Sequence, residues 1–81
     1  MPAIFRYKGF RFFFYSNEGS PREPVHVHVN GKGSEAKYWL EPEVSLARSD
    51  GFDAKELREL QEVVEQQAAL IKERWNEHFG S

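Results

Sequence analysis

Residues 25–29 alternate strictly between valine and histidine, in the order Val-His-Val-His-Val. Successive side chains of a β-strand point to opposite faces, so the three valines share one face and His26 and His28 share the other. The valine face can be buried, which turns the histidine face outward or toward a site. The alternation therefore predicts a strand, and the rest of the chain can be interpreted as the sheet and helix that support it.

An aromatic segment precedes this strand, with the order Phe-Arg-Phe-Phe-Phe-Tyr over residues 10–15. It is expected to pair with a strand at 4–7 through a two-residue turn at Lys8-Gly9, since glycine supplies the positive φ that tight hairpins need. In that register Arg6 lies opposite Arg11. The aromatic face, expected to be core, carries Phe5, Tyr7, Phe10, Phe12 and Phe14. The second face carries Ile4, Arg6, Arg11, Phe13 and Tyr15.

A second hairpin is predicted to follow, because residues 30–34 (Asn-Gly-Lys-Gly-Ser) suit a four- or five-residue loop. The strand after it, at 35–41, places Lys37 and Trp39 on the histidine face. Residues 44–46 are expected to form a short fifth strand or an extended connection. Which face of the sheet the helix covers stays open, because a one-residue slip in the first hairpin exchanges the two faces.

Residues 53–79 are predicted to form one long helix. Apolar residues recur at spacings of three and four, as one face of a helix requires: Leu57, Leu60, Val64, Ala68, Ile71, Trp75 and Phe79. Asp53 followed by Glu56 is the pattern of a capping box at its start. Such a helix would be about 40 Å long, which is more than a small sheet covers. It is expected either to kink near Gln66-Gln67 or to pack its Trp75–Phe79 end on a partner chain.

These elements predict a single α+β domain over residues 1–81. A small antiparallel sheet of two hairpins, with four to five strands, would occupy residues 1–49, and one C-terminal helix in 52–79 would pack on one face. The chain has no cysteine, which excludes a disulfide framework and thiolate zinc sites. No stretch approaches ~18 consecutive apolar residues, and the N-terminus lacks a signal-peptide pattern. The expectation is a soluble cytoplasmic protein.

The net charge is −2, but the two halves of the chain differ in sign. Residues 1–40 hold six basic and three acidic groups, whereas residues 41–81 hold five basic and ten acidic groups. Such a split can mark one face for an anion and leave the other to solvent. The alternative is that the helix is simply rich in glutamate, which is a good helix former.

The composition of the histidine face favours a nucleic-acid module. Cationic side chains would bind phosphate and aromatic rings would stack on bases, so the candidate nucleic-acid-binding residues are Arg6, Arg11, Tyr15, Lys37 and Trp39. His26 and His28 are the candidate catalytic residues, because imidazoles can transfer protons near neutral pH, as in a metal-free ribonuclease. The sequence leaves open whether any reaction is catalysed.

The spacing His26-Val27-His28 is also that of two metal ligands, whose imidazoles would project from one face ~6.6 Å apart. Zinc needs three or four ligands. Glu23 or Glu35 is the candidate for the third, and His78 lies far away on the helix. No cofactor is the default expectation, and a divalent metal held by His26 and His28 is the alternative.

A third interpretation is a protein-interaction module without catalysis. The histidine face or the Trp75–Phe79 end would then form a homodimer or dock a neighbouring protein, because exposed apolar patches are more often interfaces than catalytic sites. With no interaction at all, the aromatic side chains would be covered by residues 42–50. The candidate partners in this interpretation are a second copy of the chain or a different small protein. No membrane partner is expected.

Segments along nearly the whole chain carry a family resemblance: Ile4-Phe5-Arg6, Gly9-Phe10-Arg11-Phe12, Tyr15-Ser16-Asn17-Glu18, Glu23-Pro24-Val25-His26-Val27-His28-Val29, Ala36-Lys37-Tyr38-Trp39-Leu40, Leu46-Ala47-Arg48-Ser49, Gly51-Phe52, Glu56-Leu57 and the Trp75 to Phe79 ending. They resemble the small bacterial family called domain of unknown function 4160. The most specific motif is Pro-x-His-x-His, whose usual form has a second proline where this chain has Val25.

This resemblance implies a small cytoplasmic bacterial α+β protein, with no established activity or catalytic residue. Family members often lie beside another small uncharacterised gene. That arrangement implies a toxin–antitoxin-like role, with the neighbouring small protein as a partner, and adds a lean toward nucleic acid.

Overall fold

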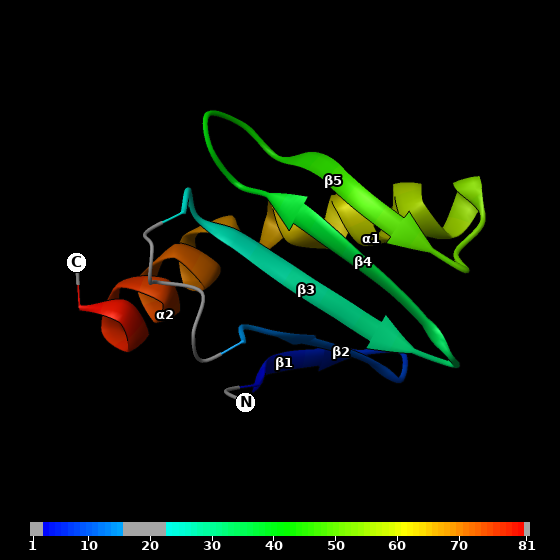
Figure 1. Ribbon diagram of the computed structural model, residues 1–81, viewed down its shortest axis with the longest axis horizontal. Helices are drawn as coiled ribbons and strands as arrows, with labels where there is room; N and C mark the ends of the chain where they lie inside the picture. Colours follow the sequence, from blue (N-terminus) through cyan, green and yellow to red (C-terminus); the bar gives the residue numbers. More distant parts are fainter. Residues whose placement is uncertain (1–2, 16–22, 81) are drawn as a thin grey trace.

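The computed structural model describes residues 3–15 and 23–80, which form an antiparallel sheet and two helices (Figure 1). The elements, in chain order, are β1 (Ala3–Tyr7), β2 (Phe10–Phe13), β3 (His26–Gly31), β4 (Ser34–Trp39), β5 (Ser45–Asp50), α1 (Ala54–Gln66) and α2 (Ala68–Phe79). The five strands lie in sequential order, β1-β2-β3-β4-β5. The predicted α+β class is confirmed, and the fifth strand is a full strand rather than an extended connection.

The first hairpin has the predicted register. Tyr7 pairs with Phe10 and Arg6 pairs with Arg11 across a two-residue turn at Lys8-Gly9, where both residues have positive φ. A bulge between Ala3 and Phe5 shifts the pairing by one residue. Because of this bulge, Ile4 packs against the core, so its predicted place on the second face is wrong.

The second hairpin is tighter than predicted. Gly31 pairs with Ser34, so the turn between β3 and β4 contains only Lys32 and Gly33, with φ of 55° and 79°. Two-residue hairpin turns with positive φ at both positions match the twist of the flanking strands. The predicted four- or five-residue loop at 30–34 is therefore wrong, because Lys32 adopts the left-handed conformation and lets Asn30 and Gly31 stay in the ladder.

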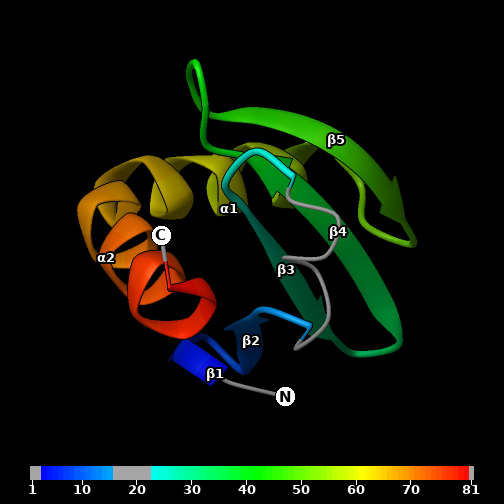
Figure 2. The same cartoon turned by 60° about the vertical axis from the view of Figure 1, so that its left-hand side comes forward.

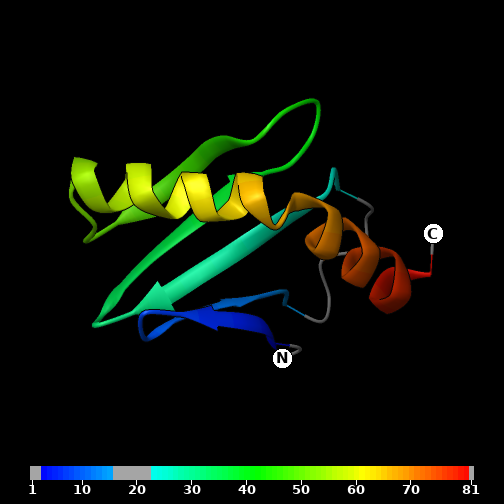
Figure 3. The ribbon, with the colours of Figure 1, turned by 180° about the vertical axis from the view of Figure 1, so that it is seen from behind.

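The valine face of the sheet is the core, and both helices cover it. In Figure 3, α1 crosses the sheet and α2 bends toward the start of β1. The buried cluster includes the predicted aromatic and helical residues: Phe10, Phe12, Phe14, Val27, Val29, Ala36, Tyr38, Leu40, Leu60, Val63, Val64, Ile71 and Trp75. The buried Tyr38 hydroxyl donates to the carbonyl of Leu57 at 2.7 Å, and burial raises the pKa of Tyr38 to about 12.

The predicted single helix is two helices. α1 ends at Gln66, and Gln67 (φ −103°, ψ 13°) leaves helical geometry before α2 begins. The break lets α2 turn, so that Trp75 packs against Phe14 with ring centroids 5.3 Å apart and is only 2% exposed. The prediction of one long helix is wrong, and the predicted kink near Gln66-Gln67 is found.

The start of α1 has the predicted capping box. The Asp53 carboxylate accepts from the backbone N–H of Glu56 at 2.8 Å, and the Glu56 carboxylate accepts from the N–H of Asp53 at 3.0 Å. Each bond satisfies an amide that the helix itself leaves without a partner. In the described part of the chain, no helix has the length and apolarity needed to cross a membrane.

This cap makes a testable contribution to stability. We expect Asp53→Ala to lower the free energy of unfolding by about 1 kcal/mol, because the first turn of α1 loses its acceptor. Asp53→Asn is the matched control and should cost only a few tenths of that, since asparagine also caps helices well. Urea unfolding followed by circular dichroism measures both. Equal losses for the two variants would contradict the capping role.

Candidate functional site

The histidine face lies opposite the helices; in Figure 2, α1 passes behind β3 and β4 and α2 lies at the left. Strand pairing arranges its side chains in rows that run across the sheet. One row, here called the charged row, consists of Arg6, Arg11, Asn30, Glu35 and Asp50. The next, the histidine row, consists of Ala3, Phe13, His28, Lys37 and Arg48. His26 pairs with Trp39 in a third row.

Two cations of this face lie over aromatic rings. The Arg11 guanidinium is 4.7 Å from the centroid of Phe13, and the Lys37 ammonium is 4.4 Å from that of Trp39. Lys37 also forms an ion pair with Glu23 at 3.3 Å, and its side chain is only 12% exposed. Its charge is therefore already partly neutralised, whereas Arg6 and Arg48 are exposed.

Arg11 has an unsatisfied donor. Its Nε is buried, and the residues that the structure describes offer it no hydrogen-bond partner. A buried donor without an acceptor costs about 1–3 kcal/mol. Arg11 lies directly opposite Arg6, and like charges in that position repel one another. Both features favour the approach of an anion to this pair of arginines.

Both histidines of the motif are buried, with His26 at 0% and His28 at 5% exposure. Their rings meet edge to face, 5.3 Å apart. The centroid of the His26 ring lies 5.4 Å from that of Trp39 and 4.9 Å from that of Trp75 in α2. The ring centroids of Tyr15 and His28 are 4.6 Å apart. The alternation thus turns the imidazoles away from the valine core, but into an aromatic cluster rather than into solvent.

The tautomer of His26 follows from its hydrogen bond. Nδ1 lies 2.9 Å from the carbonyl oxygen of Pro24, which can only accept, so Nδ1 carries a hydrogen. This tautomer leaves the ring lone pair on Nε2, and histidines that bind a metal commonly donate their other ring hydrogen to a carbonyl in the same way. In residues 3–15 and 23–80, no group of three or more His, Cys, Asp or Glu side chains is placed to hold a metal.

The sheet gathers all of the predicted site residues on one face but spreads them over four strands and the segments beside them. Arg6 and Arg11 occupy the β1–β2 side, and Lys37 and Trp39 occupy β4. Sequence reasoning missed Arg48. A bulge on β5 reverses the alternation, so that Leu46 pairs with Tyr38 on the core face while Arg48 pairs with Lys37. Strict alternation along residues 46–48 would place Leu46 and Arg48 on the same face, so the sequence alone does not predict Arg48 on the histidine face.

A polar contact between layers holds the hairpin that carries the arginine pair. Glu59 of α1 accepts a hydrogen bond from the Tyr7 hydroxyl at 2.5 Å and from the Lys8 ammonium at 2.9 Å. The hydrogen bond from Tyr7, with that from Lys8, lowers the pKa of Glu59 below its ordinary value of 4.5. The same carboxylate raises the pKa of Tyr7 and of Lys8.

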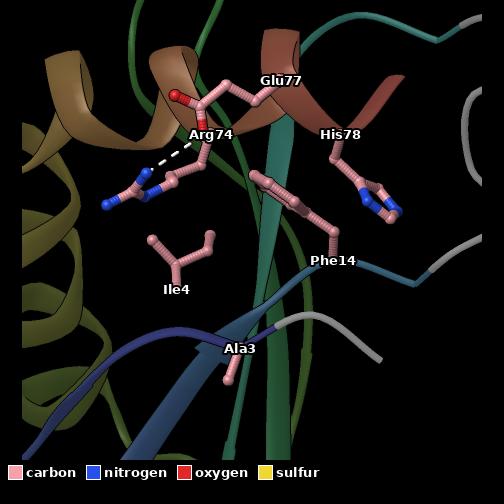
Figure 4. Close-up of a pocket in the computed structure, with 6 residues that line it drawn as sticks. All are labelled: Ala3, Ile4, Phe14, Arg74, Glu77 and His78. Carbon is pink, nitrogen blue, oxygen red and sulfur yellow. Dashed lines mark hydrogen bonds and ion pairs between the residues drawn. The ribbon is translucent and has the colours of Figure 1, made fainter. Parts of the chain in front are cut away.

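Outside the predicted site, the described residues line at least two hollows. One, of about 240 Å³, lies between α2 and the start of β1 and is lined by Ala3, Ile4, Phe14, Arg74, Glu77 and His78 (Figure 4). Its polar wall is already bonded internally, since Arg74 donates to Glu77 at 3.0 Å. The other, of about 340 Å³, lies at the acidic end of the charged row and is lined by Asn30, Gly31, Gly33, Ser34, Glu35 and Asp50.

Comparison with known proteins gives one match. A family described as Domain of unknown function (DUF4160) matches residues 9–76. That range contains β2 to β5, and with them most of the histidine face. No curated protein and no solved structure matches the chain.

The Glu59 contact predicts a pH dependence. Because the folded-state pKa of Glu59 is depressed, its contribution to stability is present above about pH 4.5 and is lost as the pH falls through the lower folded value. We therefore expect the stability difference between wild type and Glu59→Gln to shrink as the pH is lowered below about 4.5 in urea-unfolding series. Glu62→Gln removes one exposed carboxylate from the same helix and is the control. A difference that stays constant down to about pH 3 would contradict the assignment.

Proposed function

The chain belongs to the family described as domain of unknown function DUF4160, and on that premise we propose that its histidine face binds single-stranded nucleic acid. The observation that carries this proposal is the pair Arg6 and Arg11, directly opposite one another on β1 and β2. Within the described residues neither arginine has an ion-pair partner. A phosphate bound between them would relieve their repulsion and supply an acceptor for the guanidinium groups.

Aromatic side chains beside the cations favour a nucleic acid over a simple anion. Tyr15 and Trp39 are both partly exposed, and each lies next to a buried histidine of the same face. Bases stack on such rings with little dependence on sequence, while nearby cations follow the backbone. A strand running diagonally from the arginine pair to Lys37 and Arg48 would pass beside Trp39.

Binding without cleavage is favoured on this face. A catalytic imidazole must come within hydrogen-bond reach of the proton that it transfers, and both His26 and His28 are buried among aromatic rings. In this assignment the histidines orient Tyr15 and Trp39 rather than act on the phosphate. A bacterial, cytoplasmic, toxin–antitoxin-like setting is part of the proposal through the family resemblance alone.

The metal-binding alternative has less support. Two buried imidazoles do not by themselves supply the three or four ligands that zinc requires, and the described residues hold no group of three potential ligands. The protein-interaction alternative finds no support at the Trp75–Phe79 end. Trp75 is buried against Phe14 and His26 of its own chain rather than presented to a partner.

The phosphate role of the arginine pair can be tested by double substitution. With a fluorescein-labelled mixed-sequence RNA of about 10 nucleotides, we expect Arg6→Ala/Arg11→Ala to weaken binding about tenfold at low salt. The slope of log K against log salt should fall by about 0.7, because the pair is proposed to neutralise one phosphate and each phosphate contact to a single strand contributes about 0.7. Fluorescence anisotropy over a salt series measures both quantities.

The matched control removes two positive charges from the other layer. Lys55 and Arg58 are exposed residues of α1, so Lys55→Ala/Arg58→Ala has the same net charge but an intact histidine face. It should retain most of the affinity and the slope of the wild type. Equal losses for both double variants would mean that net charge alone governs binding. If the wild type does not bind the RNA at low salt, the proposed function is wrong.

A further inference from the structure

The charged row has its charges sorted by sign. At one end of the sheet Arg6 lies opposite Arg11, and at the other end Glu35 lies opposite Asp50, with Asn30 of β3 between the two pairs. Like charges directly opposite one another on neighbouring strands destabilise a sheet. In the part of the chain that the structure describes, none of these four charges belongs to an ion pair. The isolated chain therefore leaves two unfavourable pairs of opposite sign on one face.

A second copy of the chain can resolve both pairs at once. A two-fold axis that runs along β3 and lies in the plane of contact maps each end of the charged row onto the opposite end. Arg6 and Arg11 of one copy then face Asp50 and Glu35 of the other, and Asn30 faces its own equivalent. We propose that two copies dock through their histidine faces in this arrangement, held by the charged row.

The row is long enough and open enough for this contact. Five strands at about 4.8 Å spacing give a row of about 19 Å, and facing sheets pack about 10 Å apart, within reach of paired long side chains. Four of the five positions are charged, and three of these, Arg6, Glu35 and Asp50, are exposed. A two-fold contact is self-complementary by construction, as most homodimer interfaces are.

The acidic end of the row is hollowed where the arginines would enter. The 340 Å³ hollow is lined by Glu35 and Asp50 together with Asn30, Ser34 and two glycines of the turn region. Carboxylates at the wall of a polar hollow match the fork geometry of a guanidinium. This hollow is a second feature, independent of the strand register, that fits the arginine side chains of a second copy.

The neighbouring row does not oppose this arrangement. The same axis sets Lys37 and Arg48 across from Phe13 and Ala3 of the other copy, so no like charges meet. A different two-fold axis, which would set Glu35 and Asp50 against Lys37 and Arg48, places the contact over the histidine row. That arrangement would pair the acids but set Arg6 and Arg11 against Ala3 and Phe13 of the other copy, so the repulsion within the arginine pair would remain.

Such a dimer would regulate the nucleic-acid site. The arginine pair proposed to bind phosphate is the pair that the acids of the second copy would occupy, so RNA and the second copy would compete. This consequence alone rests on the proposed function. The dimer itself follows from the charge pattern and can be tested with no nucleic acid present.

A charge-swap experiment tests the dimer. In sedimentation velocity at low salt, wild type should show concentration-dependent dimerisation whose dissociation constant rises about tenfold or more between low and high salt. Glu35→Lys/Asp50→Lys makes the row wholly positive, and Arg6→Glu/Arg11→Glu makes it wholly negative. Each variant alone should be monomeric, since like charges across an interface strongly oppose association. An equimolar mixture of the two should form a heterodimer.

Several outcomes would overturn the dimer. Wild type that stays monomeric up to high concentration at low salt contradicts it, as does a mixture of the two variants that fails to associate. The variant Glu35→Gln/Asp50→Asn changes the side chains less than the lysine substitutions do, so it tests the same charges if the lysine variant misfolds. It should also weaken self-association. If Arg6→Glu/Arg11→Glu still dimerises, a contact through the histidine row replaces the one proposed.

The RNA experiments separate this result from the proposed function. Glu35→Lys/Asp50→Lys keeps the arginine pair, so it should bind the labelled RNA at least as tightly as wild type. Successful charge swap without any RNA binding would retain the dimer and remove the nucleic-acid role. RNA binding that depends on Arg6 and Arg11 in a strictly monomeric protein would retain the nucleic-acid role and remove the dimer.

Discussion

The rest of the structure depends on β3 being buried on both of its faces. Val27 and Val29 are fully buried under the helices, and His26 and His28 are buried on the opposite side at 0% and 5% exposure. A central antiparallel strand in a small domain commonly leaves one face to water. Here aromatic side chains also contact the imidazoles, and Trp75 joins this second cluster to the helix-covered core.

The aromatic cluster also explains the turn of the C-terminal helix. Trp75 contacts Phe14 from the core side and His26 at the end of the sheet, which requires α2 to leave the direction of α1 at Gln67. The same His26 contacts Trp39. A helix end, a core strand and a site residue are therefore connected through one buried imidazole.

Local patterns predicted most of the fold. The Lys8-Gly9 turn fixed the register that sets Arg6 against Arg11, and the spacing of Asp53 and Glu56 gave the helix start. The failures depend on long-range packing or on backbone choices that composition does not reveal. Nothing near Gln67 breaks a helix by itself. The Lys32-Gly33 turn, by contrast, repeats the residues and the positive φ of the Lys8-Gly9 turn, so the sequence did carry a signal for it. Alternation likewise predicted the side on which the histidines lie, but not their burial, because the rings that cover them come from other segments.

The central claim is that the histidine face, and not the helical layer, is the binding surface. An amide-resolved NMR titration with the unlabelled short RNA at low salt tests it directly. The account predicts salt-sensitive shifts at Arg6, Arg11, Trp39 and Arg48, with the amides of α1 unchanged. Shifts concentrated on α1, or shifts that persist unchanged at high salt, would contradict a phosphate-binding face built on the arginine pair.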